Sequence, residues 1–208
     1  GRHAAAHAAF RQAALAVSRR GRLAARLALS SVLLAATVAQ AATQWTADPA
    51  RSKLGFTGTL TGGSFDGAFG RFQPEITFDP TDLAGSRFRV TIETASADTR
   101  DGDRDAVLKG AEFFAVERWP KATFEAAKFA AAGPGRYSAQ GKLTLRDVTR
   151  DVTLAFTFKP AADGRTANLT GSTRVQRLDF GVGQGEWRDT AMVGNEVKIS
   201  FDLFLRRK

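Results

Sequence analysis

The stretch that decides the fold is VKISFDLFL, from Val197 to Leu205. Apolar residues alternate with polar ones over most of its length, which is the longest such run in the chain. In a β-strand, successive side chains point to opposite faces, so this alternation places the apolar residues on one face. The stretch therefore predicts a strand with one buried face.

The same alternation recurs along most of the chain that precedes this stretch. It is found at residues 54–60, 65–72, 76–78, 88–92, 124–126, 137–145, 152–158 and 169–175. Turn-forming residues separate several of these runs, such as Gly133-Pro134-Gly135 and Asp163-Gly164. We predict an all-β fold of about eight antiparallel strands, in which strands that follow one another in sequence pair and residues 54–60 and 65–72 form a hairpin.

One segment, residues 104–114, breaks the alternation. Val107, Leu108, Ala111 and Phe114 have helical spacing, and Asp101 or Asp103 can cap the helix that they predict. Many short antiparallel strands with one inserted helix favour a closed lipocalin-like barrel, because closure removes exposed strand edges. A sandwich is the alternative architecture.

The first 41 residues differ from the rest in charge. They contain six arginines and no acidic residue, which leaves 24 basic against 21 acidic residues in 42–208. Arg19 to Arg26 form a basic segment, an uncharged run from Leu27 to Val38 follows, and Ala39-Gln40-Ala41 fits an A-x-A cleavage site. We predict a leader with a secretory signal peptide over 1–41 and a periplasmic or secreted domain over 42–208. The near-neutral domain gives no reason to expect a nucleic-acid partner.

The residue types beyond position 41 restrict the chemistry. The chain has no Cys, and His3 and His7 are its only histidines, so the domain cannot form a His-based nucleophile pair or a His/Cys zinc site. The segment from Asp101 to Glu112 has the spacing of a calcium loop, but Ala106 stands where that loop needs Gly and Arg104 adds positive charge. We expect no catalytic residues and no metal site, and we expect these acids to cap the helix.

Sixteen Phe against one Tyr indicate an interior that avoids polar groups. A Phe-rich core and a barrel with an apolar cavity for one small ligand both fit this composition. Position within each strand predicts the inward-facing residues that would line such a cavity: Leu54, Phe56, Phe69, Ile76, Phe78, Val90, Phe124, Leu143, Phe156 and Phe201.

Several motifs, in this order, resemble the YceI-like polyisoprenoid-binding family from about Trp45 to Leu205. They are Arg51–Phe56, Gly67–Phe72, Arg104-Asp105 with Leu108, Phe113-Phe114, Pro120 and Phe124, then Gly141–Thr149, Arg177–Gly181, Gly185–Trp187 and Val193–Val197. The resemblance implies an exported antiparallel barrel whose tunnel holds an isoprenoid chain, such as a polyprenyl or quinone tail. It implies no catalytic residues and no cofactor other than such a bound lipid, and it allows transient contact with a membrane.

Two positions depart from the family pattern. Arg51 stands where the family has His, and Val107 stands where the family has His after its Arg-Asp pair. Two other functions stay open on the residues alone. A small outer-membrane barrel would also have eight alternating strands, although Arg206-Arg207-Lys208 at the end of the chain does not suit its last strand. A His-free enzyme would have to use Asp101, Asp103, Asp105 or Glu112.

Overall fold

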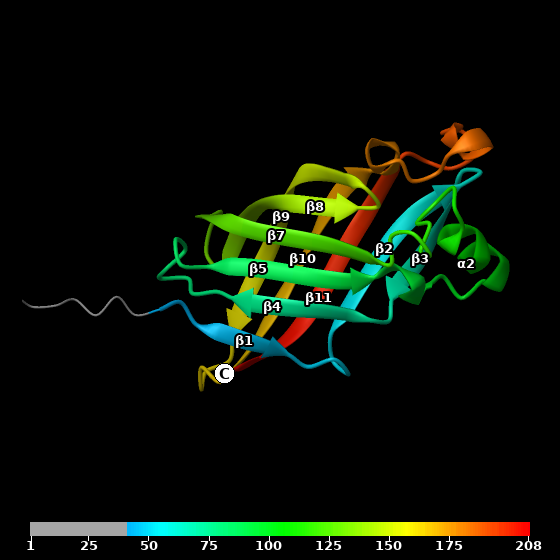
Figure 1. Cartoon of the computed structure of the whole chain (residues 1–208). Coiled ribbons are helices and arrows are strands. Elements are labelled where there is room, and N and C mark those ends of the chain that lie inside the picture. Colours follow the sequence, from blue (N-terminus) through cyan, green and yellow to red (C-terminus); the bar gives the residue numbers. More distant parts are fainter. Residues whose placement is uncertain (1–40) are drawn as a thin grey trace, which may run out of the picture. The chain divides into compact units, whose positions relative to one another are not determined.

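The computed structural model describes residues 41–208, so almost all of the predicted leader lies outside the described residues. These residues form a closed antiparallel barrel of eight strands (Figure 1). Its strands, in order around the barrel, are β1 (Gln44–Ala47), β4 (Phe72–Thr77), β5 (Arg87–Glu93), β7 (Lys121–Ala131), β8 (Arg136–Leu145), β9 (Val148–Pro160), β10 (Thr166–Gln176) and β11 (Glu196–Arg207). β1 closes the barrel because it pairs with β4 on one side and with β11 on the other. The predicted barrel is confirmed.

Three further strands extend from the barrel wall. β2 (Lys53–Leu60) pairs with the middle of β11, β3 (Gly63–Phe69) pairs with β2, and the short β6 (Ala97–Asp98) pairs with β3. The predicted hairpin is therefore present as β2 and β3.

The second arm of that hairpin ends earlier than the alternation predicted. Residues 65–72 do not form one strand, because the chain turns at Gly70 and Arg71 and Phe72 begins β4. The Gly70 N–H donates to the Ser96 carbonyl (3.1 Å) and the Arg71 N–H to the Ser96 hydroxyl (3.0 Å). These bonds hold the turn against residues 94–96. The spacing of apolar residues along the sequence cannot predict them.

The inserted helix is shorter than predicted and begins earlier. α2 spans Gly102–Lys109 instead of 104–114, and the Asp101 carboxylate caps it by accepting from the Arg104 N–H (3.0 Å). The helix ends at Lys109, and the N–H of the next residue, Gly110, donates to the Val107 carbonyl. Phe114 lies in the turns that follow the helix and is buried, whereas Val107 on the helix is 39% exposed. The four apolar residues that were predicted to share one helical face therefore do not do so.

The two faces of the barrel wall differ in polarity as the alternation predicts. In β11, Leu203 and Leu205 are buried in the core, whereas Lys198 and Asp202 are exposed. Ion pairs cross neighbouring strands on the outer wall: Arg89–Glu125 (2.9 Å), Lys142–Asp151 (2.8 Å) and Arg174–Glu196 (3.1 Å). A charged outer wall is the opposite of the apolar band that an outer-membrane barrel turns to lipid. Within residues 41–208, no helix is long and apolar enough to cross a bilayer.

Candidate binding cavity

Aromatic side chains fill one end of the barrel. Phe78 is fully buried, and its ring centroid lies 5.0–6.0 Å from those of Phe88, Phe129, Tyr137, Phe156 and Phe158. The Trp45 ring packs edge-on against Phe158 (5.4 Å), and its indole N–H donates to the Phe78 carbonyl (2.9 Å). We name these seven residues the aromatic plug. Edge-on and tilted ring pairs stabilise a fold by more than their buried area alone would, so the plug stabilises this end of the barrel.

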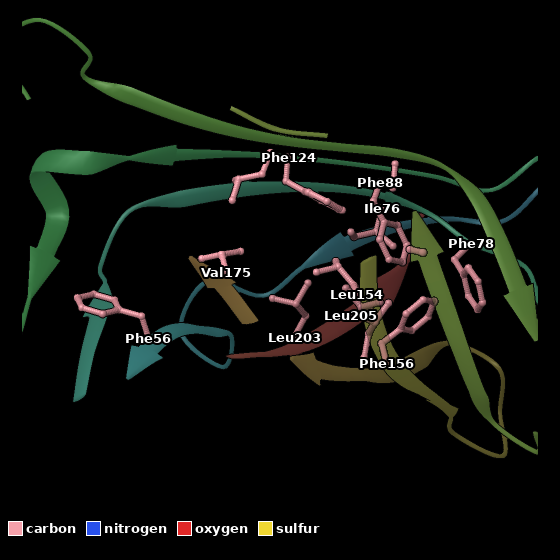
Figure 2. Packing of buried hydrophobic residues seen from close by; sticks show 14 of the residues in the cluster. Phe56, Ile76, Phe78, Phe88, Phe124, Leu154, Phe156, Val175, Leu203 and Leu205 are labelled. Atoms are coloured by element: carbon pink, nitrogen blue, oxygen red, sulfur yellow. The ribbon is translucent and has the colours of Figure 1, made fainter. Parts of the chain in front are cut away.

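A central cavity of about 80 Å³ lies beyond the plug, inside the barrel. Thr173 is the one polar side chain among the described residues that line it; its apolar lining includes Leu54, Ile76, Val90, Phe124, Leu143, Ile199 and Phe201. Figure 2 shows Phe56 and Val175 toward one end of this interior, and Phe78 and Phe156 toward the other.

A second cavity of about 120 Å³, the cap cavity, lies at the end opposite the plug. The β2–β3 hairpin, the segment that begins with α2 and the connection 177–195 enclose it; Figure 1 shows α2 and this connection (orange) at one end of the barrel. The cap cavity shares four wall residues with the central cavity, which are Leu54, Ile92, Leu143 and Ile199. The two cavities are therefore adjacent chambers of one interior that is almost wholly apolar.

Arg177 holds the connection 177–195 in place over the cap cavity. Its side chain is 4% exposed, and its guanidinium donates to four backbone carbonyls of this connection, those of Val182 (2.9 Å), Trp187 (2.7 Å), Val193 (2.6 Å) and Gly194 (3.0 Å). Burial lowers the pKa of this guanidinium, because loss of water disfavours its charged form. Sequence alternation could not reveal this role, since Arg177 begins a 3₁₀ turn in which side chains do not alternate between two faces.

A groove in the outer wall follows the seam where β2 and β3 leave the barrel. The first half of β4, Phe72–Pro74, pairs only with β5 among the described strands, and Pro74 has no N–H to offer a second partner. Leu54, Phe72 and Phe201 line both this groove and the central cavity. These three side chains therefore belong to a wall that the central cavity and the groove share.

Eight of the ten residues predicted to contact a ligand line the two cavities. They are Leu54, Phe56, Phe69, Ile76, Val90, Phe124, Leu143 and Phe201. The other two, Phe78 and Phe156, belong to the aromatic plug and line neither cavity. Among the residues that the alternation missed are Phe114 and Phe180, which lie in turns and reach the cap cavity.

The two positions that depart from the family pattern lie away from the cavities. The Arg51 guanidinium stacks 3.3 Å from the ring centroid of Phe204, outside the barrel, and Val107 lies on α2 without lining either cavity. The missing histidines therefore leave the walls of both cavities unchanged.

Two of the acids in the segment from Asp101 to Glu112 accept hydrogen bonds that hold local structure, and the first of them is the predicted helix cap. Asp101 caps α2, and the Asp105 carboxylate accepts from the Thr99 hydroxyl (2.7 Å) and N–H (2.8 Å). Both bonds lower the pKa of Asp105, and the bond from the Thr99 hydroxyl has the larger effect. Within residues 41–208, no three acidic or histidine side chains gather where they could hold a metal ion.

The family model of the YceI-like domain matches residues 45–205, which is nearly the whole barrel together with β2, β3 and α2. The chain belongs to the YceI-like family. This YceI-like chain is 28% identical over 161 residues to a UPF0312 protein of Vibrio parahaemolyticus, covering 75% of this chain and 81% of that protein. It is 32% identical over 120 residues to a UPF0312 protein of Azotobacter vinelandii, covering 56% and 62% respectively.

Solved structures contain the same YceI-like barrel. The crystal structure of Burkholderia cenocepacia BcnA matches with a TM-score of 0.72 and 34% identity, covering 76% of this chain and 98% of BcnA. A polyisoprenoid binding domain from Saccharophagus degradans matches with a TM-score of 0.64 and 14% identity, covering 80% and 99%. At that identity, the second match shows the fold alone.

Proposed function

We propose that this protein is an exported carrier that holds an isoprenoid chain inside its barrel, and that it is not an enzyme. The observation that carries the proposal is the pair of adjacent apolar cavities between the plug and the cap. Membership of the YceI-like family supports it, and so does the barrel shared with a protein described as a polyisoprenoid binding domain. A polyprenyl or quinone tail has the long, flexible, apolar form that such an interior would take.

The size of the cavities sets a condition on binding. Ligand pockets commonly measure roughly 300–1,000 Å³, whereas these cavities measure about 80 and 120 Å³. A chain of several isoprene units therefore has to displace wall side chains. The half-buried Phe72 and Phe201 at the seam are the aromatic residues best placed to move, because they border both the groove and the central cavity.

Lipid extraction from the natively purified protein, followed by mass spectrometry, tests the proposal directly. We expect an isoprenoid in the extract, and its mass identifies the head group and the number of isoprene units. A Leu143→Phe variant adds volume at a residue that both cavities share, so we expect lower occupancy.

Gln140→Phe is the matched control for that variant. It adds a ring to the same strand at an exposed position, so occupancy should remain that of the unmodified protein. Equal occupancy in the two folded variants would contradict the assignment of the interior as the binding site.

Export is tested separately from binding. We expect the intact mass of protein recovered from the periplasm or the medium to correspond to a chain that begins at Ala42, as the A-x-A site predicts. Exported protein that retains residues 19–41 would contradict the signal peptide and leave the binding proposal standing. A carrier of this kind would contact a membrane transiently when it loads or delivers its lipid.

A further inference from the structure

The two cavities offer almost nothing to the polar end of a ligand. Among the described residues, the polar side chains on their linings are Thr173 in the central cavity and Thr59 and Arg177 in the cap cavity. The Thr173 hydroxyl already donates to the Thr153 carbonyl (2.9 Å), and the Arg177 guanidinium donates to carbonyls of the connection 177–195. A polar group that is buried without a partner costs free energy. The head group of an isoprenoid amphiphile therefore belongs outside these cavities.

The groove at the seam provides polar space next to the central cavity. Its volume is about 560 Å³, several times that of either cavity. Leu54, Phe72 and Phe201 form the wall that it shares with the central cavity. Lys53 and Asp202, which face each other in the β2–β11 register, are exposed on its outer side, and neither forms an ion pair within residues 41–208.

No strand ladder closes the barrel wall at the seam. β1 joins β4 to β11 only near the plug, through residues 75–77 of β4 and 205–207 of β11. Further toward the cap, β2 takes the place beside β11, and no backbone hydrogen bond among the described residues joins Phe72–Pro74 to β2 or β11. A chain can therefore pass here by displacing half-buried side chains, without breaking a ladder.

Two other places in the wall are less suited to the passage of a chain. A second outer groove, of about 830 Å³, shares Phe88 and Val152 with the central cavity. There the strands from β5 to β9 are paired one with the next, with a single bulge in β7, so passage would break backbone hydrogen bonds. The pairing of β9 with β10 also stops before the cap, but the hydrogen bond from Thr173 to Thr153 bridges that gap.

We propose that the groove at the seam is the entrance of the binding site and also holds the head group. The chain of an amphiphile passes between Phe72 and Phe201 into the central cavity, and its polar end stays in the groove. The proposal rests on the proposed function and adds where the ligand enters and where its head lies. A head in the groove keeps its contact with water, so its size should have little effect on affinity.

The first test varies the size of the head group on one chain. The probes are geranylgeraniol and a geranylgeranylamine whose nitrogen carries a nitrobenzoxadiazole fluorophore, and titration calorimetry gives their dissociation constants. We expect the two values to agree within roughly threefold, which is less than about 1 kcal/mol. The same fluorophore on ethylamine, which lacks the chain, is the control and should not bind.

The second test fills one outer groove at a time. Ala68 is exposed and lines the groove at the seam but neither cavity, so Ala68→Trp should slow uptake of the fluorescent probe in stopped-flow measurements and weaken its binding. Ala127→Trp is the matched control, because it places the same ring at an exposed alanine of the second outer groove. That variant should behave like the unmodified protein.

A third variant widens the entrance. Phe72→Ala removes a side chain from the wall that the groove and the central cavity share. We expect both uptake and release of the fluorescent probe to become roughly tenfold faster, which corresponds to about 1.4 kcal/mol in the barrier. If this variant does not fold, the two Trp variants at exposed positions still decide the matter.

The outcomes separate this proposal from the proposed function. A loss of roughly a hundredfold in affinity when the fluorophore is added to the chain would overturn the position of the head group. Equal effects of the two Trp substitutions in folded protein would overturn the seam as the entrance, and so would slower uptake in Ala127→Trp alone. If neither geranylgeraniol nor the fluorescent probe binds, the isoprenoid-carrier function fails instead.

Discussion

The two ends of the barrel use different physical means to exclude water. At the plug, ring-to-ring contacts between strand residues fill the interior around Phe78. At the cap, a connection in which glycines 181, 183 and 185 have a left-handed backbone conformation folds over a cavity. The Arg177 guanidinium holds this connection by donating to its backbone carbonyls. The plug therefore fills its end of the barrel, whereas the cap encloses an apolar cavity at the other end.

Truncation of Phe78 should give the largest effect and separate the two ends most clearly. Phe→Ala in a core typically lowers the free energy of unfolding by about 3–5 kcal/mol. At about 2–4 °C per kcal/mol for a domain of this size, the melting temperature should fall by roughly 6–20 °C. Phe72→Ala, at the half-buried seam, is the control and should cost less. Equal losses in thermal melts would mean that the plug has no special role in stability.

A methyl group at Gly183 should damage the cap without touching the plug. Gly183 has a φ of +89°, and a Cβ there would collide with Arg177 Nη1. We expect Gly183→Ala to lower the free energy of unfolding by about 1–3 kcal/mol through backbone strain, and to reduce chain binding further because the guanidinium must move.

Gly164→Ala is the matched control for this change. Gly164 has a φ of +65°, but a Cβ there would meet no atom within 4 Å. Chemical denaturation should therefore show a loss from strain alone, with unchanged chain binding. If the two variants lost chain binding to a similar extent, the prediction that the cap contacts the ligand would be wrong.

The sequence predicts the walls of the barrel better than its ends. Alternation identifies inward-facing side chains such as Phe156 and Leu143, because each strand has one buried face. It does not give the height of a residue along the barrel, which depends on how neighbouring strands are staggered. Phe156 pairs with Tyr137 and so falls in the plug, whereas Leu143 pairs with Phe124 and borders both cavities.

The contacts within the cap are even harder to predict from the sequence, for a different reason. The carbonyls that bind Arg177 come from residues 5 to 17 positions later, in a connection with little regular structure. No periodic pattern relates a side chain to such acceptors. The position of Gly183 beside the guanidinium also follows from the folded connection and not from any local motif.

Matched Phe→Leu substitutions should show a smaller contrast between the plug and the central cavity. Phe156→Leu loosens ring packing in the plug, so we expect the free energy of unfolding to fall by about 1 kcal/mol, with lipid occupancy unchanged. Phe124→Leu enlarges the central cavity, so chain binding should tighten or longer chains should be accepted. Occupancy that changes in the plug variant alone would reverse the roles assigned to these two regions.

The smallest expected effect concerns pH and should be alike at the two ends. Hydrogen bonds from the Thr81 hydroxyl and N–H lower the pKa of Asp79 after β4, as the Thr99 bonds do for Asp105 before α2. A carboxylate whose folded pKa lies below its unfolded value stabilises the fold above the unfolded value, about 3.9, and this contribution is lost as the pH falls through the folded pKa. Because both groups are close to solvent, Asp79→Asn and Asp105→Asn should each reduce the acid-induced loss of stability by less than about 1 kcal/mol. Denaturation at pH 6 and pH 3 measures this, and a much larger effect at either residue would mean that electrostatics, and not packing alone, distinguishes the two ends.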